Sequence, residues 1–123
     1  MTVLTEGRHP SEFVVAESPG TISRDPITLA LPATTVLAPG TVLGQLAADG
    51  TYVPYDDADT DGREEAVGVL YGEARNDAAT PATVPGVIVN WGAEVRRADL
   101  VFLEGVDETA ALAQLAARGV KAR

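Results

Sequence analysis

The sequence contains no cysteine and a single histidine, His9. The absence of cysteine excludes a disulfide framework, a thiolate zinc site and a cysteine nucleophile. One histidine cannot build a multi-histidine metal site within one chain. Lys121 is the only lysine, and no glycine-rich run precedes it, so the pattern of a phosphate-binding P-loop is also missing.

Long apolar runs and basic stripes are missing as well. The apolar stretches are a few residues long, far below the roughly 20 residues of a membrane helix. Residues 1–9 show no basic head followed by an apolar core, so we expect neither a membrane span nor a signal peptide. The 18 acidic and 9 basic residues give a net charge of −9, which repels phosphate backbones. We therefore expect no nucleic-acid partner.

Most of the chain shows the pattern of a small β protein. With 123 residues, 46% hydrophobic and 22% charged, the composition fits one soluble globular domain. Short segments of strand-forming residues alternate with turn signals such as Asp49-Gly50. The predicted strands cover residues 27–31, 36–37, 41–46, 51–55, 66–71, 87–91 and 94–96. This spacing favours a small barrel or a sandwich-like fold.

One helix is predicted near the end of the sequence. Asp107 and Glu108 are placed in its first turn, where the helix dipole favours acidic side chains. Residues 110–117 are strong helix formers, and Leu112 and Leu115 share one face. Gly119 predicts the end of the helix, and residues 120–123 are expected to be extended.

Residues 1–26 differ from the rest because prolines and glycines surround one apolar patch at 13–16. A short strand with no neighbouring strand in the sequence is typical of an arm. Two interpretations remain open, an unstructured terminus and a strand that pairs only with a partner protein. We divide the chain into an N-terminal arm, residues 1–26, and a β domain, residues 27–123.

The acidic loop at residues 56–65 resembles part of an EF-hand calcium loop. The residues that match its positions 1, 3, 5 and 6 are Asp57, Asp59, Asp61 and Gly62. Gly68 stands where the bidentate glutamate is required, and both flanks are predicted strands, so the loop is not an EF-hand. A solvated acidic loop is the preferred interpretation, and a weak calcium site of another kind is the alternative.

No catalytic pattern is recognisable. The sequence has no Gly-x-Ser-x-Gly elbow, no Ser-x-x-Lys motif and only one imidazole. A small hydrolase is therefore disfavoured, and we predict a protein that is not an enzyme, with no cofactor and no bound metal. A ligand-binding β module for a carbohydrate or a receptor is the alternative to a structural role, although aromatic residues make up only 5% of the chain.

An ordered set of segments resembles the phage lambda-type head decoration protein family, and specifically its longer members with an N-terminal extension. The segments lie at residues 4–9, 12–13, 23–24, 38–44, 52–56, 66–71, 92–96 and 109–118. Together they span nearly the whole chain in the order of the family. The resemblance implies a mainly β fold, a β-clip-like small partial barrel with one C-terminal helix and a flexible N-terminal arm.

The resemblance also implies a function. Members of this family are structural proteins of the virion, made in the cytoplasm of the bacterial host. They bind as homotrimers on the outer surface of the expanded head, at three-fold and quasi-three-fold positions. There they clamp neighbouring subunits of the major capsid protein against the pressure of packaged DNA, and the arm adds a strand beside capsid protein segments.

The candidate site residues follow from this expectation. Phe13, Val14 and Val15 are the predicted anchors of the capsid-binding arm, because they are its strand-forming residues. For the trimer contact there are two candidates, Trp91 with its strand and the helix face that carries Leu112 and Leu115.

Overall fold

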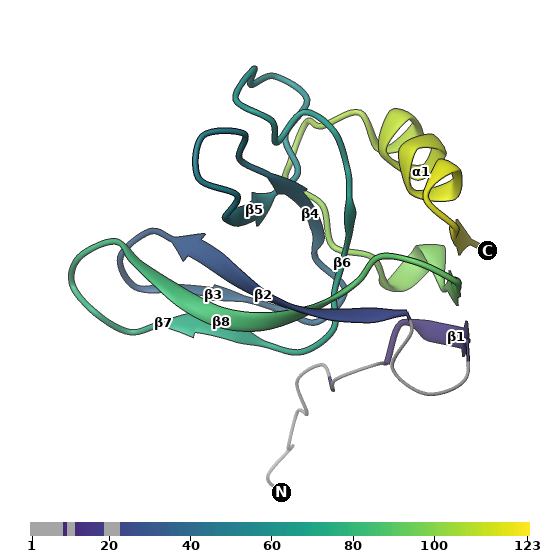
Figure 1. Ribbon diagram of the computed structural model, residues 1–123, viewed down its shortest axis with the longest axis horizontal. Coiled ribbons are helices and arrows are strands. Elements are labelled where there is room, and N and C mark those ends of the chain that lie inside the picture. Colours follow the sequence, from purple (N-terminus) through teal and green to yellow (C-terminus); the bar gives the residue numbers. More distant parts are fainter. Residues whose placement is uncertain (1–8, 10–11, 19–22) are drawn as a thin grey trace, which may run out of the picture.

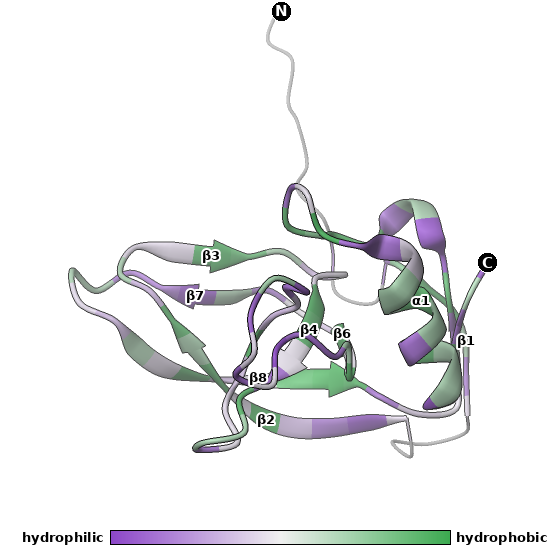
Figure 2. Cartoon of the chain, turned by 90° about the horizontal axis from the view of Figure 1, so that it is seen from above, coloured by the Kyte–Doolittle hydropathy of each residue, from purple (hydrophilic) through white to green (hydrophobic). Residues whose placement is uncertain are grey.

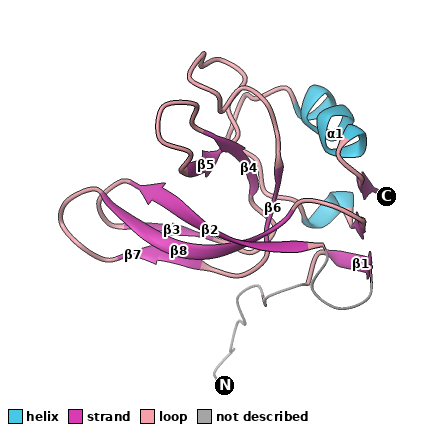
Figure 3. Ribbon diagram, viewed as in Figure 1, coloured by secondary structure: helices cyan, strands magenta, loops and turns pink. Residues whose placement is uncertain are grey.

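The computed structural model describes residues 9, 12–18 and 23–123 (Figure 1). Within these residues the chain forms ten strands, one 3-10 turn and one α-helix, which lies near the C-terminus (Figure 3). The predicted fold class, mainly β with a small barrel and one C-terminal helix, is confirmed.

Five strands form the barrel. In order around it they are β2 (Arg24–Leu31), β5 (Tyr52–Pro54), β4 (Val42–Gln45), β6 (Gly68–Leu70) and β8 (Ala82–Val89). The long strands β2 and β8 pair antiparallel along their whole length and form a ribbon that extends beyond the rest of the barrel (Figure 1). The strands β4, β6 and the end of β8 are hydrophobic where they meet in the middle of the molecule (Figure 2).

The β4–β5 hairpin turns at Asp49-Gly50, as predicted. Gly50 has a φ of +76°, and the Asp49 carboxylate accepts a hydrogen bond from the Thr51 backbone N–H at 3.0 Å. β5 pairs with β4 along its length but with β2 only through Tyr52. Pro54 therefore pairs with β4 but not with β2. A proline, which lacks a backbone N–H, is tolerated at such an unpaired edge.

Two smaller sheets complete the molecule. β3 (Thr35–Leu37) pairs antiparallel with β7 (Ala74–Asn76), and Ala74 packs against buried residues of the ribbon. The sequence analysis did not predict β7, because a three-residue strand with exposed Arg75 at its centre has no apolar signature. In the other sheet, β9 (Ala93–Val95) lies between β1 (Val14–Glu17) and β10 (Val120–Ala122).

The pairing of β1 corrects one expectation about the predicted arm, residues 1–26. We expected residues 13–16 to lack a partner within the chain, but β1 pairs antiparallel with β9, with Val14 opposite Val95 and Glu17 opposite Ala93. The partner strand lies almost 80 residues further along the sequence, where local patterning cannot reveal it. The barrel also begins inside the predicted arm, since β2 starts at Arg24.

The helix α1 (Glu108–Ala117) has the ends that the sequence predicts. The Asp107 carboxylate is its N-cap and accepts a hydrogen bond from the Ala110 backbone N–H. Gly119 has a φ of +89° and turns the chain into β10. A short 3-10 turn, η1 (Arg97–Asp99), follows β9. No helix in the described part of the chain is long and apolar enough to cross a membrane.

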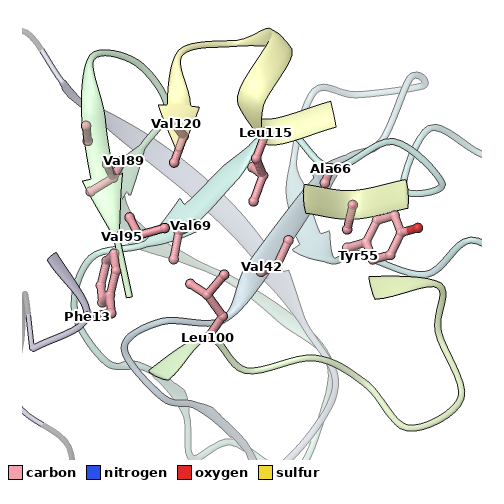
Figure 4. Close-up of a cluster of buried hydrophobic side chains, with 12 residues drawn as sticks. Phe13, Val42, Tyr55, Ala66, Val69, Val89, Val95, Leu100, Leu115 and Val120 are labelled. Atoms are coloured by element: carbon pink, nitrogen blue, oxygen red, sulfur yellow. The ribbon is translucent and has the colours of Figure 1, made fainter. Parts of the chain in front are cut away.

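The buried side chains form two clusters. The first, drawn in Figure 4, joins residues from both ends of the sequence, among them Phe13 before β1, Leu115 from α1 and Val120 from β10. The second lies against the ribbon and is built on Leu29, Leu43 and Ile88, together with Leu31, Leu70 and Ala74. We call the first the terminal core and the second the ribbon core.

Candidate functional site

The β1–β9–β10 sheet has an open edge and an exposed outer face. Within the residues that the structure describes, β1 pairs only with β9, so its other edge presents unpaired backbone groups. Phe13, Ala93, Val95 and Val120 are buried beneath the sheet, whereas the side chains of Val15, Ala16 and Lys121 are exposed. The sheet therefore offers both a strand edge and an outer face that carries apolar side chains and charges of both signs, since Glu94 lies opposite Ala16 and Lys121.

Phe13 fixes β1 to the domain. Its side chain is 1% exposed within the terminal core and lies close to Gly40. Its carbonyl oxygen accepts a hydrogen bond from the Arg96 backbone N–H at 2.7 Å. Phe13 therefore cannot contact another protein while β1 is in place, and it anchors the strand to its own chain instead.

A charged cluster fixes the other end of β1. The Glu17 carboxylate accepts hydrogen bonds from the Arg24 guanidinium, with an Nε–Oε2 distance of 2.8 Å, and from the Ser23 hydroxyl. The guanidinium lies 4.1 Å from the centre of the Tyr71 ring, within cation–π range. These contacts join β1 to the first residues of the barrel.

The same contacts lower the pKa of Glu17. The hydrogen bond from Arg24 is the largest cause and the bond from Ser23 adds to it, while burial acts in the opposite direction. The carboxylate is thus held in its charged form, which the bidentate contact with Arg24 requires.

Of the three predicted arm anchors, Val15 alone is widely exposed, at 50% of its surface. Val14 is half-buried and packs against the terminal core. The structure therefore places Phe13 directly before β1 and Val14 and Val15 within it, and it gives the three side chains different surroundings. Only Val15 is placed to contact another protein through its side chain.

The residues predicted for the trimer contact also differ in exposure. Trp91 follows β8 and is 52% exposed, the largest exposed apolar side chain in the described part of the chain. Leu115 is fully buried in the terminal core, and Leu112 is half-buried against it. A Cβ added to Gly119 would lie 3.3 Å from Trp91 Cδ1, which places the indole beside the turn after α1.

The acidic loop, residues 56–65, is held by bonds within the chain. The Arg63 guanidinium donates to Asp61, with Nη2–Oδ2 at 2.9 Å, and this contact lowers the pKa of Asp61. Asp57 accepts a hydrogen bond from the Asp107 backbone N–H, and Glu65 pairs with Arg118. Across residues 9, 12–18 and 23–123, no three carboxylate or histidine side chains come together as a metal site.

The sequence analysis did not predict an apolar groove between the ribbon and the β4–β5 hairpin. The groove has a volume of about 850 Å³, and Leu103 at its rim is 45% exposed. Its other apolar lining includes Leu31, Leu37, Leu46, Val53 and Pro54. Since these residues come from four separate segments, only the folded chain brings them together.

A comparison with known protein families shows which family the chain belongs to. The family described as bacteriophage lambda head decoration protein D matches residues 3–120, nearly the whole chain. The chain belongs to this family. No curated protein matches the sequence. The match confirms the resemblance inferred from the ordered segments. Head decoration proteins are structural components of the phage capsid and not a family of enzymes.

Proposed function

We propose that this head decoration protein binds as homotrimers on the outer surface of the expanded phage head. It occupies three-fold and quasi-three-fold positions and clamps neighbouring subunits of the major capsid protein against the pressure of packaged DNA. The observation that carries the proposal is the family match over residues 3–120. The alternative of a carbohydrate-binding or receptor-binding module has no comparable support.

The open edge of β1 supports a contact with the shell by strand addition. An extended segment of the major capsid protein can pair with the unpaired backbone groups of β1. β9 already holds β1 extended, so the contact costs little ordering of β1 itself. In this arrangement Val15 contacts the shell, while Phe13 and Val14 hold the strand in position.

The charge of the chain supports a position on the outer surface. Three copies at −9 each carry −27, which disfavours a surface that faces packaged DNA. A trimer also presents three β1 edges to the shell at once. Because the second and third contacts are then intramolecular, weak single contacts add to a strong attachment.

Quantitative co-sedimentation tests the proposal. Purified protein is mixed with expanded heads that lack it and, separately, with unexpanded procapsids of the same phage. We expect uptake that saturates at a fixed ratio to capsid subunits on expanded heads only, and decorated heads that withstand higher temperature. Absence of uptake by both shells, or equal uptake by both, would contradict the proposal.

A further inference from the structure

The segment that contains the acidic loop is bonded to the start of the helix α1. We call this segment, residues 55–66, the bracket. The Asp57 carboxylate accepts a hydrogen bond from the Asp107 backbone N–H, and the Tyr55 hydroxyl donates one to the Asp107 carbonyl oxygen, both at 3.0 Å. Asp107 is also the N-cap of α1. The bracket therefore holds the residue at which the helix begins.

The bracket also contacts the middle and the end of α1. The side-chain oxygen of Gln114 accepts a hydrogen bond from the backbone N–H of buried Ala66 at 2.8 Å. At the end of the helix, the Arg118 guanidinium pairs with the Glu65 carboxylate, with Nη2–Oε1 at 3.1 Å. These four contacts join positions that lie about 50 residues apart in the sequence, and they are spaced along the whole helix.

The bracket is itself fixed to the barrel. The Ala47 backbone N–H, just after β4, donates a hydrogen bond to the Asp61 carbonyl oxygen at 2.9 Å. Gly62 has a φ of +114° and packs so closely that an added Cβ would collide with the carbonyl oxygen of Gln45. The acidic loop is thus held between the barrel on one side and α1 on the other.

Apolar packing alone gives α1 a narrow contact with the domain. Among its ten residues Ala111 and Leu115 are the buried ones, and an isolated helix of this length is marginal in water. Both side chains lie in the terminal core, which also contains Tyr55 from the bracket, Val120 from β10 and Phe13 before β1. Figure 4 shows this cluster with Tyr55 at one side and Phe13 at the other. The helix therefore connects the bracket to the β1–β9–β10 sheet.

We propose that the bracket positions α1 and, through it, restrains the opening of the β1–β9–β10 sheet. The chain passes from α1 into β10 through Gly119, so a helix that loosens takes β10 with it. β9 and β1 then lose both a neighbouring strand and part of the terminal core, and the sheet opens as one unit. The link to the shell rests on the proposed function, because β1 is the edge assigned there to the capsid contact.

Hydrogen exchange of the full chain tests the restraint. Three backbone N–H groups report on the sheet: those of Ser18 and Arg96 bond across β1 and β9, and that of Arg123 bonds to β9 from the end of β10. Q114L removes the oxygen that pairs with Ala66 and should speed exchange of all three at least about tenfold. Q114E keeps an oxygen at this position and should exchange like the native chain.

The controls separate a local opening from a general loss of stability. The Thr34 N–H, bonded to the Ala78 carbonyl oxygen at the end of the ribbon, should exchange at the native rate in every variant. Q45L changes a glutamine whose side chain bonds to Gly50 in the β4–β5 hairpin, and it should leave the sheet unchanged. Y55F, which removes one hydroxyl at the start of α1, should act on the same N–H groups as Q114L.

Three results would overturn the inference. The first is equally faster exchange at Thr34 in Q114L, which would show a general loss of stability. The second is native exchange at Ser18 and Arg96 in both Q114L and Y55F. The third is exchange in Q114E as fast as in Q114L, because the hydrogen bond to Ala66 would then have no part in the effect.

Heating of decorated heads distinguishes this inference from the proposed function. The open form is rare near room temperature, so Q114L should be taken up by expanded heads like the native chain. On heating, bound Q114L should leave the heads at a temperature about 4 °C lower than the native chain and Q114E. Equal release temperatures would contradict the link between the bracket and the shell. Failure of the native chain to bind heads would overturn the proposed function alone, because the exchange experiment involves no shell.

Discussion

The two ends of the molecule are stabilised in different ways. The terminal core joins β1, β9, β10 and α1, which come from opposite ends of the sequence, and single side chains such as Phe13 and Leu115 hold them together. The ribbon core packs residues of β4, β6 and β7 against β2 and β8, whose eight paired positions form a continuous ladder. The comparison indicates that buried anchor side chains mainly stabilise the terminal end, whereas backbone pairing between β2 and β8 mainly stabilises the ribbon end.

The largest effect is expected at the terminal core. Replacing buried Phe13 by alanine removes an aromatic ring from a closely packed cluster and should lower the free energy of unfolding by about 3–5 kcal/mol. Chemical denaturation measures the loss. Val15→Ala, two residues further along the chain in β1, is the matched control and should change the stability by less than about 0.5 kcal/mol. Equal effects of the two variants would contradict the anchoring role of Phe13.

At the ribbon end the corresponding anchor is polar. Buried Asn76 donates hydrogen bonds to the carbonyl oxygens of Leu31, Pro32 and Thr80, and its own oxygen accepts one from the Ala78 N–H. Asn76→Ala leaves these groups unpaired and should cost about 1–3 kcal/mol. Hydrogen exchange should rise at residues 77–81 and stay unchanged in β1. An equal rise in β1 would show that the two ends are one unit.

The contact between Glu17 and Arg24 should make the terminal end sensitive to acid. Because the folded-state pKa of Glu17 lies below its ordinary value of 4.5, the carboxylate stabilises the fold above that pH. This stabilisation is lost as the pH falls through the folded-state pKa. The stability difference between the native chain and Glu17→Gln should therefore be about 1 kcal/mol at neutral pH and shrink below pH 4.5.

Urea denaturation of both proteins between about pH 3 and pH 7 measures this difference. Glu104→Gln is the control, because Glu104 lies on an exposed loop, and its stability should follow the native chain at every pH. A difference for Glu17→Gln that is constant across the range would show that the charge of Glu17 does not contribute.

The smallest expected effect has the opposite sign. Thr34 lies at the end of the ribbon and, among the described residues, is the only non-glycine residue with a positive φ, at +52°. Thr34→Gly removes the strain of a β-branched side chain in this conformation, about 1–2 kcal/mol, but increases the freedom of the unfolded chain. We expect the free energy of unfolding to rise by up to about 1 kcal/mol, which thermal unfolding measures. The same change at Thr35 in β3 should destabilise.

The sequence predicted much of the fold because most elements are marked locally. The hairpin at Asp49-Gly50 and the helix between Asp107 and Gly119 have turn and cap residues that act within a few positions. The pairing of β1 with β9 depends on a partner almost 80 residues away, and no local pattern reveals it. Trp91 was predicted inside a strand, yet β8 ends at Val89 and the indole is exposed beyond it.

The candidate site was less predictable than the fold. Strand-forming character identified Phe13, Val14 and Val15 together, but burial separates them. Phe13 precedes β1 and is buried in the terminal core, whereas Val15 lies at the irregularity in the pairing between Val14 and Ala16 and is exposed. The groove beside Leu103 could not be predicted at all, since its lining residues are brought together only by the folded chain. An exposed leucine in a loop carries no such signal in the sequence.

The most direct test compares shell binding by two variants with matched exposure at the two ends. Val15 in β1 and Val36 in β3 are 50% and 46% exposed, so an aspartate at either position should leave the fold intact. Uptake by expanded heads is measured by co-sedimentation across a range of protein concentrations. The account predicts that Val15→Asp weakens binding by at least about tenfold, while Val36→Asp binds like the native chain. Equal binding by the two variants, or a loss confined to Val36→Asp, would contradict it.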